Sequence, residues 1–286
     1  MTTYATLIAA PELAALPPAE VLIVDCRFDL ADADAAQRQH AEAHVPGAVY
    51  AHLDRELSDL SKRGLGRHPL PDAAAFSALL SRWGWTPALQ VVAYDAAGGA
   101  LAAARLWWML RLVGAARAAV LDGGMQAWIA AGLPLEAGVP ARTPTRVEAH
   151  YDETQLAGFD VAARAGRDPS LLLLDARAAP RYRGEIEPID PVAGHVPGAR
   201  NRPFADNLDD SGRFKRAQTL RHEFAALLGA RKPTDVVHMC GSGVTACHNL
   251  LAMEHAGLSG SRLFAPSWSG WVSDPSRPVE KAEAGQ

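Results

Sequence analysis

The sequence predicts an α/β protein made of two tandem copies of one domain, each a mainly parallel sheet flanked by helices. Short apolar stretches alternate along the chain with longer helix-like stretches, which is typical of parallel sheets covered by helices. A length of 286 residues fits two domains of about 140 residues each. The predicted strands are 21–25, 90–94, 118–121, 171–175 and 235–239, and predicted helices include 73–83, 100–113, 219–228 and 246–256.

One set of landmarks occurs twice, at a spacing of about 150 residues. The matching pairs are Asp-x-Arg at 25–27 and 175–177, His-Val-Pro-Gly-Ala at 44–48 and 195–199, the apolar stretches 91–95 and 236–240, and Trp128 with Trp271. Because loops tolerate insertions while the order of elements is kept, this pattern indicates a duplicated domain. We predict an N-terminal domain at 1–137, a linker at 138–150 and a C-terminal domain at 151–286.

A thiol stands at the end of the last predicted strand. Cys240 opens the sequence Cys-Gly-Ser-Gly-Val-Thr, and a helix is predicted directly after it. Gly241 and Gly243 let the backbone curl so that successive N–H groups converge on the sulfur, and the helix adds its positive end. Such a position stabilises a thiolate, so Cys240 is predicted to be a nucleophile. The alternative interpretation is a buried cysteine that only packs.

The first copy lacks this thiol. Asp95 stands where the second copy has Cys240, and a carboxylate cannot serve as a sulfur nucleophile. One active copy and one inert copy are therefore expected. The other cysteines, Cys26 and Cys247, are interpreted as packing residues.

Composition argues against several classes of function. A net charge of −4 gives no basic surface for nucleic acid or for an anionic membrane, and no apolar run approaches the length of a membrane span. The three cysteines form no C-x-x-C pair, so neither a zinc site nor a thioredoxin motif is predicted. The first residues lack basic side chains and the apolar stretch is cut by Pro11, which does not fit a signal peptide. We expect a cytoplasmic protein with reduced thiols.

Taken together, these motifs resemble the tandem-domain rhodanese family of thiosulfate and 3-mercaptopyruvate sulfurtransferases. The resemblance runs from about residue 19 to residue 279 and includes Leu-Asp-Gly-Gly at 121–124 and the cysteine loop at 240–245. It implies two rhodanese-like domains, with an inert N-terminal copy and a catalytic C-terminal copy. It also implies that Cys240 takes sulfur from a small-molecule donor as a persulfide and passes it to thioredoxin, glutathione, another thiol or cyanide. No metal or organic cofactor is implied.

The resemblance assigns roles to further residues. Arg181 matches a substrate-binding arginine of the family, and the amides of the loop, from Gly241 through Gly243, Val244 and Thr245, can stabilise charge on the transferred sulfur. In the mercaptopyruvate branch, a serine after the cysteine belongs to a Ser-His-Asp relay. The matching residues here are Ser242, His68 and Asp54. An ordinary turn serine, a loop histidine and a solvated or capping carboxylate are the alternative interpretations.

The residues after the cysteine bear on the choice of sulfur donor. Thiosulfate enzymes of the family carry Arg and Lys after the cysteine, whereas Gly241 and Ser242 resemble the mercaptopyruvate branch. That branch often has a second substrate arginine within Glu-Pro-Arg, but this chain has Ile189 at that place, and an isoleucine cannot pair with a carboxylate. Arg183, Arg200 or Arg202 could substitute. We predict a 3-mercaptopyruvate sulfurtransferase, with a thiosulfate:cyanide sulfurtransferase as the alternative.

Other classes of function fit the sequence less well. The motif of a cysteine phosphatase is Cys followed by five residues and Arg. Counted from Cys240, this chain has Ala246 at the arginine position, so the phosphate clamp is missing. A cysteine hydrolase lacks a local signature. A non-catalytic binding module is the remaining alternative, because inert rhodanese-like domains exist, although the retained Cys240 argues against it.

Overall fold

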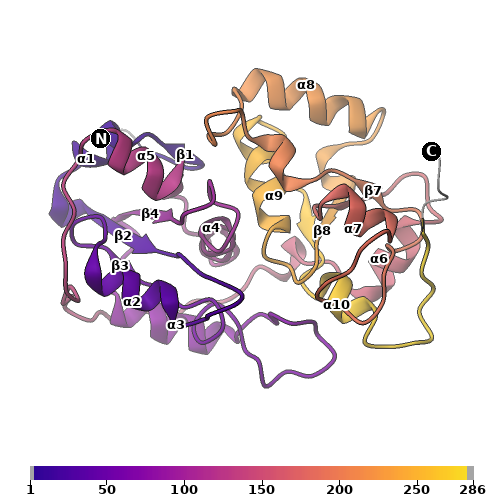
Figure 1. Cartoon of the computed structure of the whole chain (residues 1–286), viewed down its shortest axis with the longest axis horizontal. Coiled ribbons are helices and arrows are strands. Elements are labelled where there is room, and N and C mark those ends of the chain that lie inside the picture. Colours follow the sequence, from indigo (N-terminus) through magenta and orange to yellow (C-terminus); the bar gives the residue numbers. More distant parts are fainter. Residues whose placement is uncertain (1–2, 282–286) are drawn as a thin grey trace. The chain divides into compact units, whose positions relative to one another are not determined.

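The computed structural model describes residues 3–281, and these form two compact units (Figure 1). The first unit comprises the chain up to Asp59, Leu70–Asp152 and Asp210–Phe214; the second comprises Leu60–Pro69, Glu153–Asp209 and the chain from Lys215 onward. The predicted domain boundaries at 137 and 151 stay predictions. The residues 1–2 and 282–286 of the predicted domains lie outside the described residues.

The first unit is built on a five-stranded sheet in the order β1-β5-β4-β2-β3, and its strand pairs are parallel. Its central strands are rich in Val, Leu and Ala and are buried along their length, as expected for a parallel sheet covered on both faces. The strands are β1 (Leu7–Ile8), β2 (Val21–Asp25), β3 (Val49–Tyr50), β4 (Gln90–Tyr94) and β5 (Ala118–Leu121).

Helices cover both faces of this sheet. Alternate residues of β2 point to opposite faces. Val21 and Ile23 pack with Leu13 and Trp128 in one apolar cluster, while Leu22 points to the other face and is equally buried. The helices are α1 (Ala10–Ala14), α2 (Ala35–Glu42), α3 (Ala73–Arg82), α4 (Ala103–Leu112) and α5 (Gly124–Ala130), with a 3-10 turn at Pro18–Glu20.

The second unit repeats this plan with a four-stranded parallel sheet in the order β7-β6-β8-β9. Its strands are β6 (Leu172–Asp175), β7 (Arg200–Asn201), β8 (Val236–Met239) and β9 (Arg262–Leu263). Its helices are α6 (Phe159–Ala165), α7 (Ala179–Arg183), α8 (Ala217–Leu228), α9 (Ala246–His255) and α10 (Ser267–Trp271), with 3-10 turns at Glu153–Gln155, Phe204–Asn207 and Pro233–Asp235. Val237 and Met239 of β8 pack with Trp268 and Trp271 of α10, which fixes the end of β8 in the core.

The predicted fold class is confirmed. The predicted strands and helices are present, with ends that shift by at most a few residues. The two-residue edge strands β1, β3, β7 and β9 were not predicted, because two residues are too few to show an alternating pattern. In the part of the chain that the structure describes, no helix combines the length and the apolar character needed to cross a bilayer.

Candidate active site

Cys240 directly follows β8, where the carboxyl ends of parallel strands commonly carry binding sites. The thiol is buried, and the backbone N–H of Gly243 donates to Sγ at 3.2 Å. Gly243 has φ +76°, and a β-carbon there would lie 2.4 Å from the carbonyl oxygen of Ala265. Only glycine fits this turn without strain, so the sequence pattern of the loop follows from its backbone path.

The side chain of Ser267 forms hydrogen bonds with the backbone at the start of the cysteine loop. The Oγ atom of Ser267 accepts the N–H of Cys240 at 3.1 Å and lies 3.0 Å from the carbonyl oxygen of Phe264, to which it donates. Ser267 has φ +52°, a left-handed conformation that is rare for residues other than glycine. The N–H groups of Trp268 and Ser269 continue the contact by donating to the carbonyls of Cys240 and Gly241, at 2.9 Å each. The first turn of α10 thus fixes the backbone on which the thiol stands.

The remaining loop residues begin the next helix. Val244 is buried, Thr245 is partly exposed, and their carbonyls accept N–H groups of the first turn of α9. Their own N–H groups stand at the start of α9, where the helix dipole favours negative charge. Cys247 lies in α9 with its Sγ atom 3.4 Å from the carbonyl oxygen of Gly243, consistent with a packing role.

Ser242 and His68 come together in the second unit. His68 Nδ1 lies 2.8 Å from Ser242 Oγ, and both side chains are buried. The two residues are far apart in the sequence, but Leu60–Pro69 belongs to the second unit and brings the imidazole to the cysteine loop. Asp54 belongs to the first unit, where its backbone N–H donates to His52 Nδ1 at 3.2 Å. Its place in a relay stays a prediction.

Arg181 lies on α7 beside the cysteine loop. A β-carbon placed on Gly241 would lie 3.6 and 3.7 Å from its terminal nitrogens Nη1 and Nη2. The guanidinium already pairs with Glu187, through Nε at 3.2 Å and Nη2 at 2.6 Å, and with Asp190 through Nη2 at 3.1 Å. Burial alone would raise the pKa of Glu187, but the hydrogen bond from Arg181 helps to hold it below the usual value. Arg181 therefore lies near Gly241 of the cysteine loop, but most of its donors are engaged.

Sequence reasoning missed Arg67. Its Nη2 atom would lie 3.1 Å from a β-carbon placed on Gly241, closer than either nitrogen of Arg181, and its Nη1 atom pairs with Asp190. Burial raises the pKa of Asp190, although Arg67 and Arg181 act in the opposite direction. The only sequence signal was that Arg67 directly precedes His68.

None of the three arginines that could replace the one missing at position 189 is placed at the cysteine loop. Arg183 pairs with Glu185 at 2.6 Å, Arg200 is exposed, and Arg202 pairs with Glu223 at 2.5 Å while its guanidinium stacks on Phe224. None of these contacts involves the cysteine loop.

In the first unit, the loop that corresponds to the cysteine loop holds a carboxylate where the second unit has the thiol. Asp95 follows β4, is fully buried, and its carboxylate accepts backbone N–H groups from the loop and the start of α4. The donors are Ala97 and Gly99, at 2.8 and 2.9 Å, and Leu101, Ala102 and Ala103, at 3.0, 3.2 and 3.2 Å. Cys26, the other thiol of this unit, is buried in the core, and burial raises its pKa well above the usual value.

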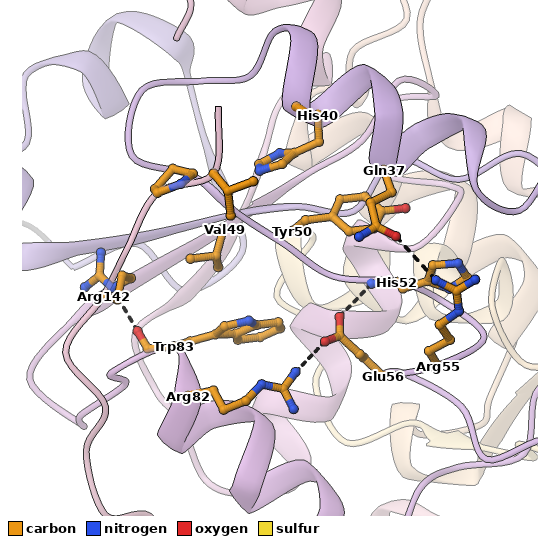
Figure 2. Close-up of a pocket in the computed structure, with 13 residues that line it drawn as sticks. Gln37, His40, Val49, Tyr50, His52, Arg55, Glu56, Arg82, Trp83 and Arg142 are labelled. Atoms are coloured by element: carbon orange, nitrogen blue, oxygen red, sulfur yellow. Dashed lines mark hydrogen bonds and ion pairs between the residues drawn. The ribbon is translucent and has the colours of Figure 1, made fainter. Parts of the chain in front are cut away.

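A cavity of about 390 Å³ lies in the first unit beside α2 and β3 (Figure 2). No cysteine is among its described lining residues. Glu56 accepts from Arg82 and from the backbone N–H of His52, and Arg142 donates to the carbonyl of Trp83 at 2.8 Å. These charged groups are already partnered, and Cys240 is not among the residues that line this cavity. Across residues 3–281, no group of three or more His, Cys, Asp or Glu side chains is arranged to hold a metal ion.

Comparison with known proteins identifies the family. The model of the rhodanese-like domain matches the chain twice, at residues 9–131 and 160–274. The chain belongs to the rhodanese family. Rhodanese-family relatives resemble it over nearly its whole length: the "Probable 3-mercaptopyruvate sulfurtransferase" of Pseudomonas aeruginosa is 47% identical, over 96% of this chain and 98% of that protein. The human 3-mercaptopyruvate sulfurtransferase is 35% identical, over 82% of this chain and 79% of that protein.

A solved rhodanese-family structure gives the same result in three dimensions. The 3-mercaptopyruvate sulfurtransferase from Leishmania major superimposes with a TM-score of 0.81 at 34% identity, and covers 92% of this chain and 73% of that one. The resemblance stated from the motifs is thereby confirmed, including the two rhodanese-like segments.

Proposed function

We propose that this chain is a 3-mercaptopyruvate sulfurtransferase that carries the transferred sulfur as a persulfide on Cys240. The observation that carries the proposal is the loop after β8, in which a buried thiol accepts an N–H from Gly243 beside the Ser242–His68 pair. The Pseudomonas aeruginosa, human and Leishmania major relatives are named as 3-mercaptopyruvate sulfurtransferases, which are transferases, whereas a Mycobacterium tuberculosis relative that is 39% identical over 97% of this chain is named as a putative thiosulfate sulfurtransferase.

In the first half-reaction, the Cys240 thiolate attacks the sulfur of 3-mercaptopyruvate. A sulfur–sulfur bond forms while the bond between that sulfur and carbon 3 breaks, and its electron pair passes into the enolate of pyruvate. The enolate takes up the proton that the donor thiol releases, so pyruvate leaves and Cys240 carries a persulfide. The N–H of Gly243 and the positive end of α9 stabilise negative charge on the sulfur atoms.

In the second half-reaction, an acceptor thiolate attacks the outer sulfur of the persulfide. The new bond joins that sulfur to the acceptor, and the bond to Cys240 breaks to regenerate the thiolate. The acceptor is a thiol such as thioredoxin or glutathione, or cyanide. The reaction needs no metal and no organic cofactor, because the sulfur atoms themselves undergo the change.

Ser242 and His68 act on the oxygen side of the donor. The Ser242 hydroxyl donates to the donor's carbonyl oxygen as that oxygen gains enolate charge, and His68 at 2.8 Å orients the hydroxyl and moves its proton. The family resemblance assigns Asp54 to this relay as its third member. Arg181 contributes positive charge beside the loop.

The sequence after the thiol supports mercaptopyruvate rather than thiosulfate. Gly241 and Ser242 bring no charge of their own, whereas a dianionic donor would favour cations at these two places.

The N-terminal copy is an inert scaffold, since the carboxylate of Asp95 accepts the N–H groups of its loop. The protein works in the cytoplasm, where its three thiols stay reduced.

Steady-state turnover with each donor separately tests the proposal, with one thiol acceptor throughout and Cys240→Ser as the blank. A higher kcat/KM for 3-mercaptopyruvate than for thiosulfate is expected, and Cys240→Ser should abolish both activities. Preference for thiosulfate would contradict the choice of donor. Undiminished turnover by Cys240→Ser would contradict the persulfide itself.

A further inference from the structure

The space over Gly241 is bordered by two guanidinium groups. A β-carbon at Gly241 would lie 3.1 Å from Arg67 Nη2 and 3.6 Å from Arg181 Nη1. A side chain at this position would therefore crowd Arg67 and touch Arg181. Because Gly241 directly follows Cys240, an anionic group that contacts both guanidinium groups here would lie at the cysteine loop.

The two guanidinium groups differ in what they can still bind. The Nε and Nη2 atoms of Arg181 form the side-on fork that suits a carboxylate, and Glu187 occupies that fork. Arg67 uses Nη1 for Asp190, and neither its Nε nor its Nη2 atom has a hydrogen-bond partner among residues 3–281. Arg67 therefore has two parallel N–H donors that no described residue accepts, and such a pair is the geometry that binds a carboxylate most strongly, although neighbouring atoms cover Nε in this structure.

The backbone of Arg67 is fixed relative to the cysteine loop. Its N–H donates to Ser269 Oγ at 3.0 Å, and the N–H of Ser269 in turn donates to the carbonyl of Gly241 at 2.9 Å. The preceding residue, Gly66, has φ +91°, and a β-carbon there would lie 2.5 Å from the carbonyl oxygen of Pro266. Only glycine allows this close approach, so the backbone that carries the Arg67 side chain is held at one place beside the loop.

We propose that Arg67 binds the carboxylate of the sulfur donor and supplies the cation that the chain lacks at Ile189. The inference rests on the proposed function, because it assumes a donor with a carboxylate. It shifts the main anchor of that carboxylate from Arg181, whose fork Glu187 occupies, to a residue outside α7. Donor specificity then depends on the segment Gly66–Arg67–His68, in which one residue holds the carboxylate and the next serves Ser242.

The first test compares Arg67→Gln, Arg67→Lys and the matched control Arg183→Gln in turnover of 3-mercaptopyruvate. Losing charge-assisted hydrogen bonds to the carboxylate should raise KM roughly ten- to a hundredfold in Arg67→Gln, with a smaller change in kcat. Arg67→Lys keeps the charge without the fork and should recover part of the loss. Arg183→Gln, which removes a partly exposed arginine paired with Glu185, should match the parent. Equal KM values for Arg67→Gln and the parent would overturn the proposal.

The second test needs no turnover. Cys240 is alkylated by iodoacetate or by its neutral analogue iodoacetamide; in each case the thiolate sulfur bonds the methylene carbon and iodide leaves. The ratio of the two rates, followed at Cys240 by mass spectrometry, reports whether a nearby cation receives a carboxylate. Arg67→Gln should lower this ratio about tenfold, and Arg183→Gln should leave it unchanged.

The two tests separate failure of the inference from failure of the proposed function. An unchanged alkylation ratio in Arg67→Gln would overturn the role of Arg67, even if the chain turns over 3-mercaptopyruvate. A lowered ratio in a chain without mercaptopyruvate turnover would support Arg67 as a carboxylate-binding residue and contradict the proposed donor. Urea unfolding of each variant shows that the compared chains are equally folded.

Discussion

His68 Nδ1 lies 2.8 Å from Ser242 Oγ, although the two residues come from opposite halves of the sequence. This contact joins the segment 60–69 to the cysteine loop within one compact unit. In the proposed function His68 acts as a base toward the hydroxyl two residues after the nucleophile, a partner that a turn serine would not need. The contact makes the predicted relay open to test.

Removing either member of the Ser242–His68 pair should slow sulfur transfer from 3-mercaptopyruvate. We expect Ser242→Ala and His68→Asn each to lower kcat by about 10²-fold, since that is the usual size of a general acid–base contribution. The double variant should be little slower than either single one, because the two groups act as a unit. His222→Asn, an exposed histidine of α8, is the control. Additive losses in the double variant would mean that the two side chains act independently.

Ser267 should stabilise the cysteine loop through its side chain at some cost in backbone strain. Ser267→Ala loses both hydrogen bonds of Oγ and keeps the left-handed backbone, so we expect the free energy of unfolding to fall by about 1–3 kcal/mol. Ser267→Gly loses the same bonds but relieves the strain, and should be about 1 kcal/mol more stable than Ser267→Ala. Urea denaturation measures both. An alanine variant as stable as the glycine variant would show that the φ of +52° carries no strain.

Asp95 should matter for stability and not for chemistry. Asp95→Ala leaves the N–H groups of its loop without their acceptor, so unfolding should become easier by about 2 kcal/mol or more. At a temperature where the variant is folded, its kcat for sulfur transfer should equal that of the parent. A lower kcat with unchanged stability would contradict the inert role of the first copy.

His238 should make the protein less stable in acid. It lies in β8 fully buried, its two ring nitrogens have no hydrogen-bond partner among the described residues, and burial lowers its pKa from 6.5 to about 3. Between these two pH values the unfolded chain takes up a proton that the folded chain does not, so stability falls as pH falls through this window.

Unfolding in urea between pH 7 and pH 4 measures this effect. His238→Leu removes the titrating group, so its advantage over the parent should grow as the pH falls, reaching the order of a few kcal/mol. His222→Asn removes an exposed histidine and should leave the pH dependence unchanged. Parallel pH profiles for the parent and His238→Leu would contradict the neutral, buried state of His238.

The features that the sequence predicted well are local ones. The strand 236–239, the glycines of the loop and the start of α9 are adjacent in the chain, so their pattern alone places Cys240 at the end of a strand. Asp95 was identified as its counterpart because duplication preserves the order of elements. The edge strands escaped notice because each has only two residues.

The features that the sequence did not predict depend on contacts between distant segments. Arg67 reaches Gly241 and Asp190 only because Leu60–Pro69 packs into the second unit. The spacing of these residues in the sequence does not predict such a contact. The pairing of Arg181 with Glu187 was likewise not predicted, since it depends on how the loop after α7 folds back. Charge partners of this kind decide which arginine is open to a substrate, and they require the three-dimensional structure.

Cys240 is proposed to accept sulfur from 3-mercaptopyruvate, and intact-protein mass spectrometry after a single turnover without acceptor measures this transfer. We predict a gain of one sulfur atom per chain, located on Cys240, lost on addition of a thiol and absent in Cys240→Ser. A chain that releases pyruvate without gaining sulfur, or that carries the sulfur on Cys26 or Cys247, would contradict it.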